Sequence, residues 1–254
     1  MTPIEYIDGY YFKRDDKYEV FGVKGGKARS AYQLIQQGIE KGFDNFVTAG
    51  SRMSPQCEIV STICEAMGVN CHLFMPSGKE TSVLSNIAKN KKSTIHKCEV
   101  GYNSVICSRA KKFADEKKYF HIPFGMECEE NIEIMKHQVR NIPQSIKRIV
   151  IPCGSGMSLI SVVKGLQYYN MSNIKVVGVQ VGKNPIDNLN KFLGLKNSLF
   201  GTNINYEIVK SQLDYHQMLT DTTFCGIELD PIYEAKCIPF MEKGDLLWIV
   251  GKRL

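Results

Sequence analysis

The sequence lacks the features that mark membrane, secreted and metal-binding proteins. No stretch approaches the roughly 18 consecutive apolar residues of a membrane-spanning helix, and residues 1–16 are too polar for a signal peptide. The nine cysteines are odd in number and form no Cys-x-x-Cys pair, which argues against a disulfide framework or a zinc site. We therefore expect a cytoplasmic protein with reduced thiols and no metal.

Complete nucleotide-binding motifs are also absent. The Gly-x-Gly-x-x-Gly pattern that would begin at Gly154 has Leu159 in place of its third glycine, and no Gly-Lys-Ser/Thr of a P-loop occurs. The net charge of +6 is only mildly basic. The lysine clusters at residues 89–92 and 111–118 lack the interleaved aromatic residues that stack nucleobases, so they indicate solvated helix faces rather than a nucleic-acid site.

A short glycine loop is the clearest binding signal that is present. Residues 148–153 predict a buried strand and residues 158–168 predict a helix, and the loop between them consists of Gly154, Ser155, Gly156, Met157 and Ser158. Glycines between a strand and a helix let backbone N–H groups and the positive helix end approach one anion. The loop therefore predicts a phosphate site, although the same pattern also fits a tight turn or a nucleotide site.

Lys27 follows two glycines at the start of a second predicted helix. A lysine held there in a closed pocket would have a lowered pKa, and its neutral amine could condense with an aldehyde such as that of pyridoxal 5'-phosphate. The alternative is an exposed lysine in a glycine turn.

Four segments in chain order together resemble the fold type II pyridoxal-phosphate enzymes, in particular the family of 1-aminocyclopropane-1-carboxylate deaminase and D-cysteine desulfhydrase. They cover residues 12–29, 48–56, 152–158 and 225–236. The resemblance implies that Lys27 forms the Schiff base with the cofactor and that residues 154–158 hold its phosphate. Ser54 and Gln56 match the loop that receives the substrate carboxylate, where Ser51 and Arg52 can add donors.

Two residues depart from that family's pattern. Pro55 replaces an asparagine whose side chain reaches the cofactor ring, and Ser54-Pro55 is also a standard helix start. Cys225 falls on the position that we expect to face the pyridine nitrogen, where the deaminases carry a glutamate. A neutral thiol there would weaken the ring as an electron sink and would favour β-elimination or β-replacement. A core cysteine, or an alignment slip of a residue or two, is the alternative.

Strand and helix patterns alternate along the chain, which predicts an α/β fold with mainly parallel sheets flanked by helices. Strands are expected at 45–49, 71–75, 94–98, 119–122, 149–152, 175–181, 206–209 and 246–250, and further helices at 55–67, 80–89, 104–116 and 127–140. The family's plan implies two lobes, a larger cofactor-binding lobe of residues 1–44 and 126–254 and a smaller inserted lobe of residues 45–125. It also implies a homodimer.

The expected reaction is α-proton abstraction from an amino acid through a Lys27 aldimine, helped by Ser54, followed by β-elimination or β-replacement. Two alternatives stay open. One is a pyridoxal-phosphate enzyme of another reaction type, acting on an amino acid attached to a larger molecule such as a nucleic acid. The other is a non-catalytic protein that binds a phosphate ligand.

Overall fold

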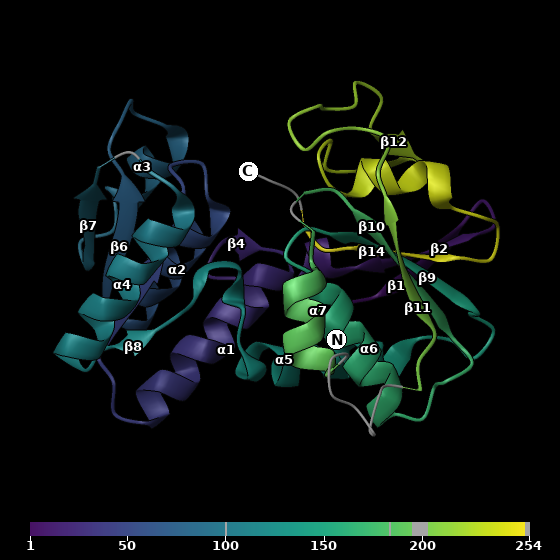
Figure 1. Ribbon diagram of the computed structural model, residues 1–254, viewed down its shortest axis with the longest axis horizontal. Helices are drawn as coiled ribbons and strands as arrows, with labels where there is room; N and C mark the ends of the chain where they lie inside the picture. Colours follow the sequence, from purple (N-terminus) through teal and green to yellow (C-terminus); the bar gives the residue numbers. More distant parts are fainter. Residues whose placement is uncertain (100, 183, 195–202, 252–254) are drawn as a thin grey trace. The chain divides into compact units, whose positions relative to one another are not determined.

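The computed structural model describes residues 1–99, 101–182, 184–194 and 203–251 (Figure 1). The chain forms two compact units, which are described separately. The first consists of Met1–Tyr18 together with the described residues from Glu129 onward, and the second of Glu19–Cys128. Among the described residues, no helix combines the length and the apolar content that crossing a bilayer demands.

The first unit is built on a six-stranded sheet with the order β1-β2-β14-β9-β10-β11. β1 and β2 form an antiparallel hairpin, and every other neighbouring pair is parallel. The strands are β1 (Ile4–Ile7), β2 (Tyr10–Arg14), β9 (Arg148–Cys153), β10 (Lys175–Gln180), β11 (Tyr206–Lys210) and β14 (Leu246–Ile249). β14 therefore lies between a strand from the start of the chain and one from its middle.

Both faces of this sheet are covered, which explains why β9 and β10 read as continuous apolar runs. Side chains of helices pack on one face, with Val139, Leu159, Val163 and Leu189 in that core. A short hairpin and a 3-10 helix pack on the other, with Ile227 and other apolar side chains. These elements are η1 (Asp15–Lys17), α5 (Glu129–Met135), η3 (Lys136–Asn141), α6 (Met157–Tyr168), α7 (Ile186–Leu193), β12 (Thr223–Phe224), β13 (Ile227–Glu228) and η4 (Glu234–Phe240).

The second unit contains a parallel four-stranded sheet with the order β7-β6-β5-β8. Its strands are β5 (Asn45–Ala49), β6 (Asn70–Pro76), β7 (Ser93–Cys98) and β8 (Phe120–His121). Its other elements are β3 (Glu19–Val20), β4 (Val23–Lys24), α1 (Gly26–Glu40), α2 (Pro55–Met67), α3 (Ser82–Ile87), α4 (Asn103–Lys117) and η2 (Phe124–Met126). Ile106, Ala110 and Ala114 of α4 pack on the buried side chains of β5 and β6.

The expected fold class is confirmed, since both sheets are mainly parallel and flanked by helices. The expected strands correspond to β5 to β11 and β14, within one or two residues at each end. The helix expected at 127–140 is wrong in its form, because the structure divides this segment into α5 and the 3-10 helix η3. The compact second unit begins at Glu19, so it includes residues 19–44 that the family's plan assigns to the larger lobe.

The Lys-Arg-Asp-Asp segment at 13–16 belongs to the frame of the first unit. Lys13 and Asp15 are fully buried. The Lys13 ammonium donates to the Thr2 carbonyl at 2.9 Å, and Asp15 accepts from the Thr2 hydroxyl at 2.6 Å and from the Trp248 indole at 3.0 Å. These bonds join the start of the chain to β14, which is a structural role for this part of the sequence motif.

Candidate functional site

The glycine loop joins the carboxyl end of β9 to α6. Gly156 stands at the N-cap of α6 with φ +88°, a conformation that favours glycine, and a Cβ there would lie 2.9 Å from the Pro185 Cβ. The Asn188 side chain donates to the Ser155 carbonyl at 2.8 Å and fixes the loop from α7. Because the first turn of a helix has N–H groups with no intrahelical acceptor, the start of α6 can bind an anion.

Tyr233 lies against this loop, and Tyr215 lies beside Tyr233. A Cβ added to Gly154 would lie 3.3 Å from the Tyr233 ring, and one added to Gly182 would lie 3.3 Å from the Tyr215 ring. The two phenol oxygens are 3.4 Å apart. Tyr233 is positioned by Asp230, whose Oδ1 accepts from the Tyr233 backbone N–H at 3.0 Å. The sequence alone did not identify Tyr215 or Tyr233 as site residues, since neither lies near the loop in sequence.

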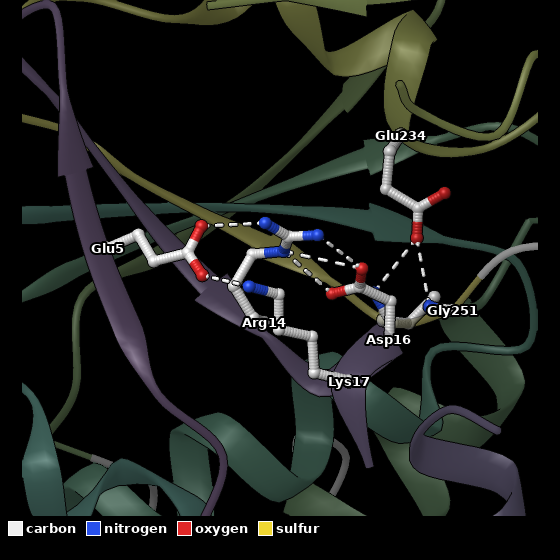
Figure 2. Close-up of polar contacts among 7 residues, drawn as sticks. Glu5, Arg14, Asp16, Lys17, Glu234 and Gly251 are labelled. Atoms are coloured by element: carbon white, nitrogen blue, oxygen red, sulfur yellow. Dashed lines mark hydrogen bonds and ion pairs between the residues drawn. The ribbon is translucent and has the colours of Figure 1, made fainter. Parts of the chain in front are cut away.

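Glu234 brings a buried carboxyl group to the same edge of the sheet. Its Oε1 accepts from the backbone N–H groups of Val250, at 2.8 Å, and Gly251, just beyond the carboxyl end of β14 (Figure 2). Its Oε2 is buried and has no hydrogen-bond partner among the described residues. Burial, together with the nearby Asp230 carboxylate, raises the pKa of Glu234 to about 8. The raised pKa favours the protonated carboxyl group at neutral pH, and its second oxygen is a buried polar atom that lacks a partner within the described part of the chain.

Arg14 is held at this edge by carboxylates of its own unit. Its guanidinium lies 2.6 Å from Glu5 and 2.7 Å from Asp16, and Lys17 also pairs with Glu5 (Figure 2). The hydrogen bond with Asp16 raises the pKa of Arg14. The positive charge of Arg14 is thus balanced by two carboxylates, which orders the end of β2.

Cys225 lies elsewhere in the first unit. It and Gly226 form the two-residue turn between β12 and β13, both with positive φ. Burial and the Asp8 carboxylate raise the pKa of its thiol, while Lys243 lowers it. Asp8 and Lys243 precede β2 and β14, so Cys225 lies at the edge where these strands begin, whereas the glycine loop follows the end of β9. The structure does not bring Cys225 and residues 154–158 together.

Lys27 lies in the first turn of α1 in the second unit. Gly25 is the N-cap residue, with φ +94°, and its carbonyl accepts from Ala28 and Arg29. Gly25 and Gly26 are buried, whereas Lys27 is exposed. Both β4 and α1 contact α2. The segment that carries Lys27 therefore lies beside the helix that Ser54 begins.

The loop after β5 carries the other expected site residues. Ser54 occupies the N-cap position of α2 but makes no side-chain capping bond, and its backbone N–H donates to the Ser51 carbonyl at 2.9 Å. The Ser54 hydroxyl instead bonds the Cys57 thiol, although burial still raises the pKa of that thiol. A Cβ at Gly50 would lie 2.7 Å from the Ser54 hydroxyl, so Gly50 allows this close approach.

Gln56 and Arg52 are tied to neighbouring backbone. The Gln56 amide nitrogen donates to Thr48 at 2.9 Å and to the Pro123 carbonyl at 2.8 Å, while its oxygen accepts from the Gly125 N–H at 2.8 Å. The Arg52 guanidinium donates to the Lys79 carbonyl at 2.8 Å. Gln56 therefore fixes the loop from within, and the groups left to face a ligand are backbone donors, the Ser51 hydroxyl and the remaining Arg52 nitrogens.

A match to a protein-family model identifies the family of this chain. A family model described as pyridoxal-phosphate dependent enzyme matches residues 2–198. The chain belongs to this family. The protein is therefore a pyridoxal-phosphate-dependent enzyme, and this membership favours an enzyme over a non-catalytic phosphate-binding protein.

Individual relatives have low sequence identity. An O-seryl-dTMP PLP-dependent decarboxylase of Salmonella phage ViI is 24% identical over 70% of this chain and 48% of its own length. This chain thus spans about half of that relative. A putative 1-aminocyclopropane-1-carboxylate deaminase of Pyrococcus horikoshii is 25% identical over 96% of this chain and 86% of its own.

Solved structures agree on the fold. The crystal structure of an ACC deaminase homologue has a TM-score of 0.79 and 21% identity, and it covers 98% of this chain and 89% of that chain. The resemblance to the deaminase and desulfhydrase family and the fold type II architecture are confirmed. The expected cofactor, pyridoxal phosphate, is confirmed with them.

Proposed function

We propose that the enzyme abstracts the α-proton of an amino acid and eliminates or replaces its β-substituent. The observation that carries this proposal is the pairing of the glycine loop with the buried Glu234 carboxyl at one edge of the sheet, in a chain of the pyridoxal-phosphate family. The donor set suits the cofactor. Backbone amides at the start of α6 match a phosphate, and the Oε2 of Glu234, a buried atom that lacks a partner among the described residues, matches a ring nitrogen.

Bound pyridoxal phosphate supplies an electron-withdrawing ring that stabilises negative charge at the substrate α-carbon. We propose that Gly154 to Ser158 hold the phosphate through their backbone N–H groups, with Ser155 and Ser158 adding hydroxyl donors. The Lys27 amine holds the aldehyde end and later accepts the α-proton at its Nζ. Ser51, Arg52 and the backbone N–H groups in the first turn of α2 receive the substrate carboxylate, and the Gln56 side chain positions that loop.

We propose Glu234, rather than Cys225, as the group that faces the ring nitrogen. Cys225 lies at the opposite edge of the sheet from the glycine loop, whereas Glu234 lies at the same edge. Tyr233, whose ring lies against Gly154, can act on the leaving group as a proton donor.

A spectroscopic experiment tests the Lys27 assignment. The purified protein supplied with pyridoxal phosphate is expected to be yellow and to be bleached by borohydride, and Lys27→Ala is expected to lose the colour. Lys24→Ala is the matched control, because Lys24 is an exposed lysine that precedes the same glycines and pairs with Glu19. A Lys27→Ala protein with the wild-type spectrum would refute the assignment.

A second comparison tests the ring partner. Glu234→Gln keeps an oxygen for the Val250 and Gly251 amides but cannot exchange a proton with the ring nitrogen, so it is expected to move the visible absorption maximum and to slow turnover by at least tenfold. Cys225→Ser is expected to leave both unchanged. If Cys225→Ser changed the absorption maximum and the turnover and Glu234→Gln changed neither, Cys225 would be the group that faces the ring nitrogen.

A substrate screen tests the reaction. Cysteine, serine and β-chloroalanine, each as both enantiomers, are assayed for keto acid, ammonia and the released β-group. Elimination yields one keto acid and one ammonia for each leaving group released. Turnover of none of these amino acids would contradict the proposal.

A second candidate function is decarboxylation of an amino acid carried on a nucleotide. The observation in its favour is the similarity to the phage O-seryl-dTMP decarboxylase over 70% of this chain. Decarboxylation of O-seryl-dTMP releases carbon dioxide, places a proton on the α-carbon and leaves the amine attached to the nucleotide. Carbon dioxide without keto acid, measured on that compound, would favour this function over elimination.

We propose a cytoplasmic enzyme and a homodimer, which light scattering would report as twice the 28.7 kDa of one chain. A monomer at working concentration would contradict the second.

A further inference from the structure

The second unit contains a cavity that the proposed reaction does not use. Its volume is about 150 Å³, and it lies among the carboxyl ends of β6 and β7, the following loop and α3. Met75, Leu84 and Ile95 contribute apolar walls, and Ala88 stands at its mouth. A cavity of roughly 150 Å³ admits a molecule the size of benzene, which is also the size of a branched aliphatic side chain.

Two opposite charges stand at the rim of this cavity. Glu80 and Lys97 both line it, and both are exposed. No ion pair joins them, and within the described residues the Lys97 ammonium has no hydrogen bond to another side chain. Glu80 accepts from the Ser85 hydroxyl at 3.2 Å through Oε1, which leaves its Oε2 for another donor. The rim thus offers one cation and one anion above an apolar floor.

This combination selects one chemical class of ligand. A carboxylate is attracted to Lys97, an ammonium group to Glu80, and an aliphatic group to the floor. A free α-amino acid carries all three within a few bonds. The volume is too small for a nucleotide or for the cofactor, since sites for drug-sized ligands begin at about 300 Å³.

The cavity is connected to the loop that we assign to the substrate carboxylate. The Thr81 hydroxyl donates to the Arg52 carbonyl at 2.9 Å, and the Arg52 guanidinium donates to the Lys79 carbonyl at 2.8 Å. Gly78 lines the cavity, and a Cβ there would lie 2.5 Å from Arg52 Cζ. The wall of the cavity and the Arg52 loop therefore form one bonded structure.

We propose that this cavity is a second amino-acid site, which binds a free α-amino acid with an aliphatic side chain, such as leucine or valine. The side chain lies among Met75, Leu84 and Ile95, the carboxylate faces Lys97, and the ammonium faces Glu80. The site is independent of the proposed reaction, because it needs neither Lys27 nor the cofactor.

Methyl NMR of the holoenzyme tests the site. L-leucine is titrated into protein labelled at its methionine methyls, with the Met75 resonance assigned from Met75→Leu. The expected result is a saturable shift of Met75 that survives in Lys27→Ala, so that failure of the proposed reaction leaves this result intact. No saturable Met75 shift at tens of millimolar leucine overturns the proposal.

Variants and analogues test the ligand class. Lys97→Gln is expected to weaken leucine binding at least tenfold, whereas Lys91→Gln, at an exposed lysine beyond α3, leaves it unchanged. Ala88→Leu fills the mouth and is expected to abolish the shift. Isocaproate, which lacks the ammonium group, and isoamylamine, which lacks the carboxylate, are each expected to bind at least tenfold more weakly. Equal binding of leucine and these analogues, or equal effects of the two lysine variants, overturns the amino-acid assignment.

Discussion

At the residue scale, Glu234 links pH to stability before any cofactor binds. Its pKa is raised from 4.5 to about 8, so the folded apoprotein holds a proton that the unfolded chain releases near pH 4.5. The folded state binds more protons across this window, and the free energy of unfolding falls as pH rises from about 4.5 to about 8. The contribution is complete below that window and lost above it.

Glu234→Gln is therefore expected to flatten this part of the pH profile in the apoprotein. The change is on the order of 3 kcal/mol between pH 5 and pH 8, measured as the free energy of unfolding in urea. Glu242→Gln is the control, because Glu242 is an exposed carboxylate paired with Arg148. An unchanged slope in Glu234→Gln would show that this carboxyl group is ionised in the folded protein.

At the scale of single elements, the start of α6 depends on Gly156. Gly156→Ala would force a Cβ into a positive-φ position and to within 2.9 Å of Pro185, so we expect a loss of about 2 kcal/mol and weaker cofactor binding. Gly226→Ala is the control, because Gly226 also has a positive φ, +74°, but a Cβ there would have no atom within 4 Å. It is expected to lose only about 1 kcal/mol and to bind the cofactor normally. Equal losses in urea unfolding would mean that strain alone, and not the contact with Pro185, decides.

The sheet of the second unit contains a histidine pair that titrates. His72 Nδ1 lies 3.1 Å from His96 Nε2, and His96 stacks on Phe74 with ring centroids 4.5 Å apart. Burial lowers the pKa of both histidines below 6.5, and His96 lowers that of His72 further. Neutral rings are therefore favoured in the folded state, and their stabilisation is present above pH 6.5 and lost as pH falls through the lowered values.

His96→Phe keeps an aromatic ring on Phe74 but removes one titrating group. The loss of thermal stability between pH 7 and pH 5 is expected to be smaller in this variant than in the wild type, as measured by circular dichroism. His216→Gln, at an exposed loop position, is expected to behave as the wild type. A variant that loses as much stability as the wild type on acidification would contradict the role of the pair.

Sequence patterns predict the helices and strands whose own residues repeat with a clear helical or strand period and carry clear end signals. The helix at 55–67 matches α2 at both ends, because Ser54-Pro55 begins it and Gly68 ends it in the left-handed conformation. β1 and β2 were not predicted, in part because buried Lys13 of β2 bonds Asn141, a partner 128 residues away. Alternation along the strand cannot reveal such partners.

The site was only partly predictable for the same reason. The glycine loop lies within one continuous segment, so its residues identify it. Tyr215, Tyr233 and Glu234 reach this edge from other segments, and only the register of β14 beside β9 brings the backbone that Glu234 binds close to the loop. The sequence around Cys225 alone does not show whether this residue lies in a turn or in the site.

At the scale of the whole molecule, the cofactor is expected to stabilise the fold. A ligand that binds only the folded state adds about 2.7 kcal/mol at a free concentration one hundred times its Kd. The holoenzyme should therefore melt at a higher temperature than the apoprotein, with a smaller increase for Lys27→Ala. Calorimetry at several cofactor concentrations measures this, and a melting temperature independent of cofactor would contradict the assignment of the site.

The position of β14 also has a consequence for synthesis on the ribosome. This strand pairs with β2 on one side and β9 on the other, so the two halves of the first sheet cannot join until residues 246–249 have left the exit tunnel. The second unit, encoded by the uninterrupted stretch 19–128, can fold much earlier. A nascent chain stalled before residue 246 would therefore carry a finished second unit beside a first hairpin with an unpaired edge, a species that chaperones would be expected to recognise.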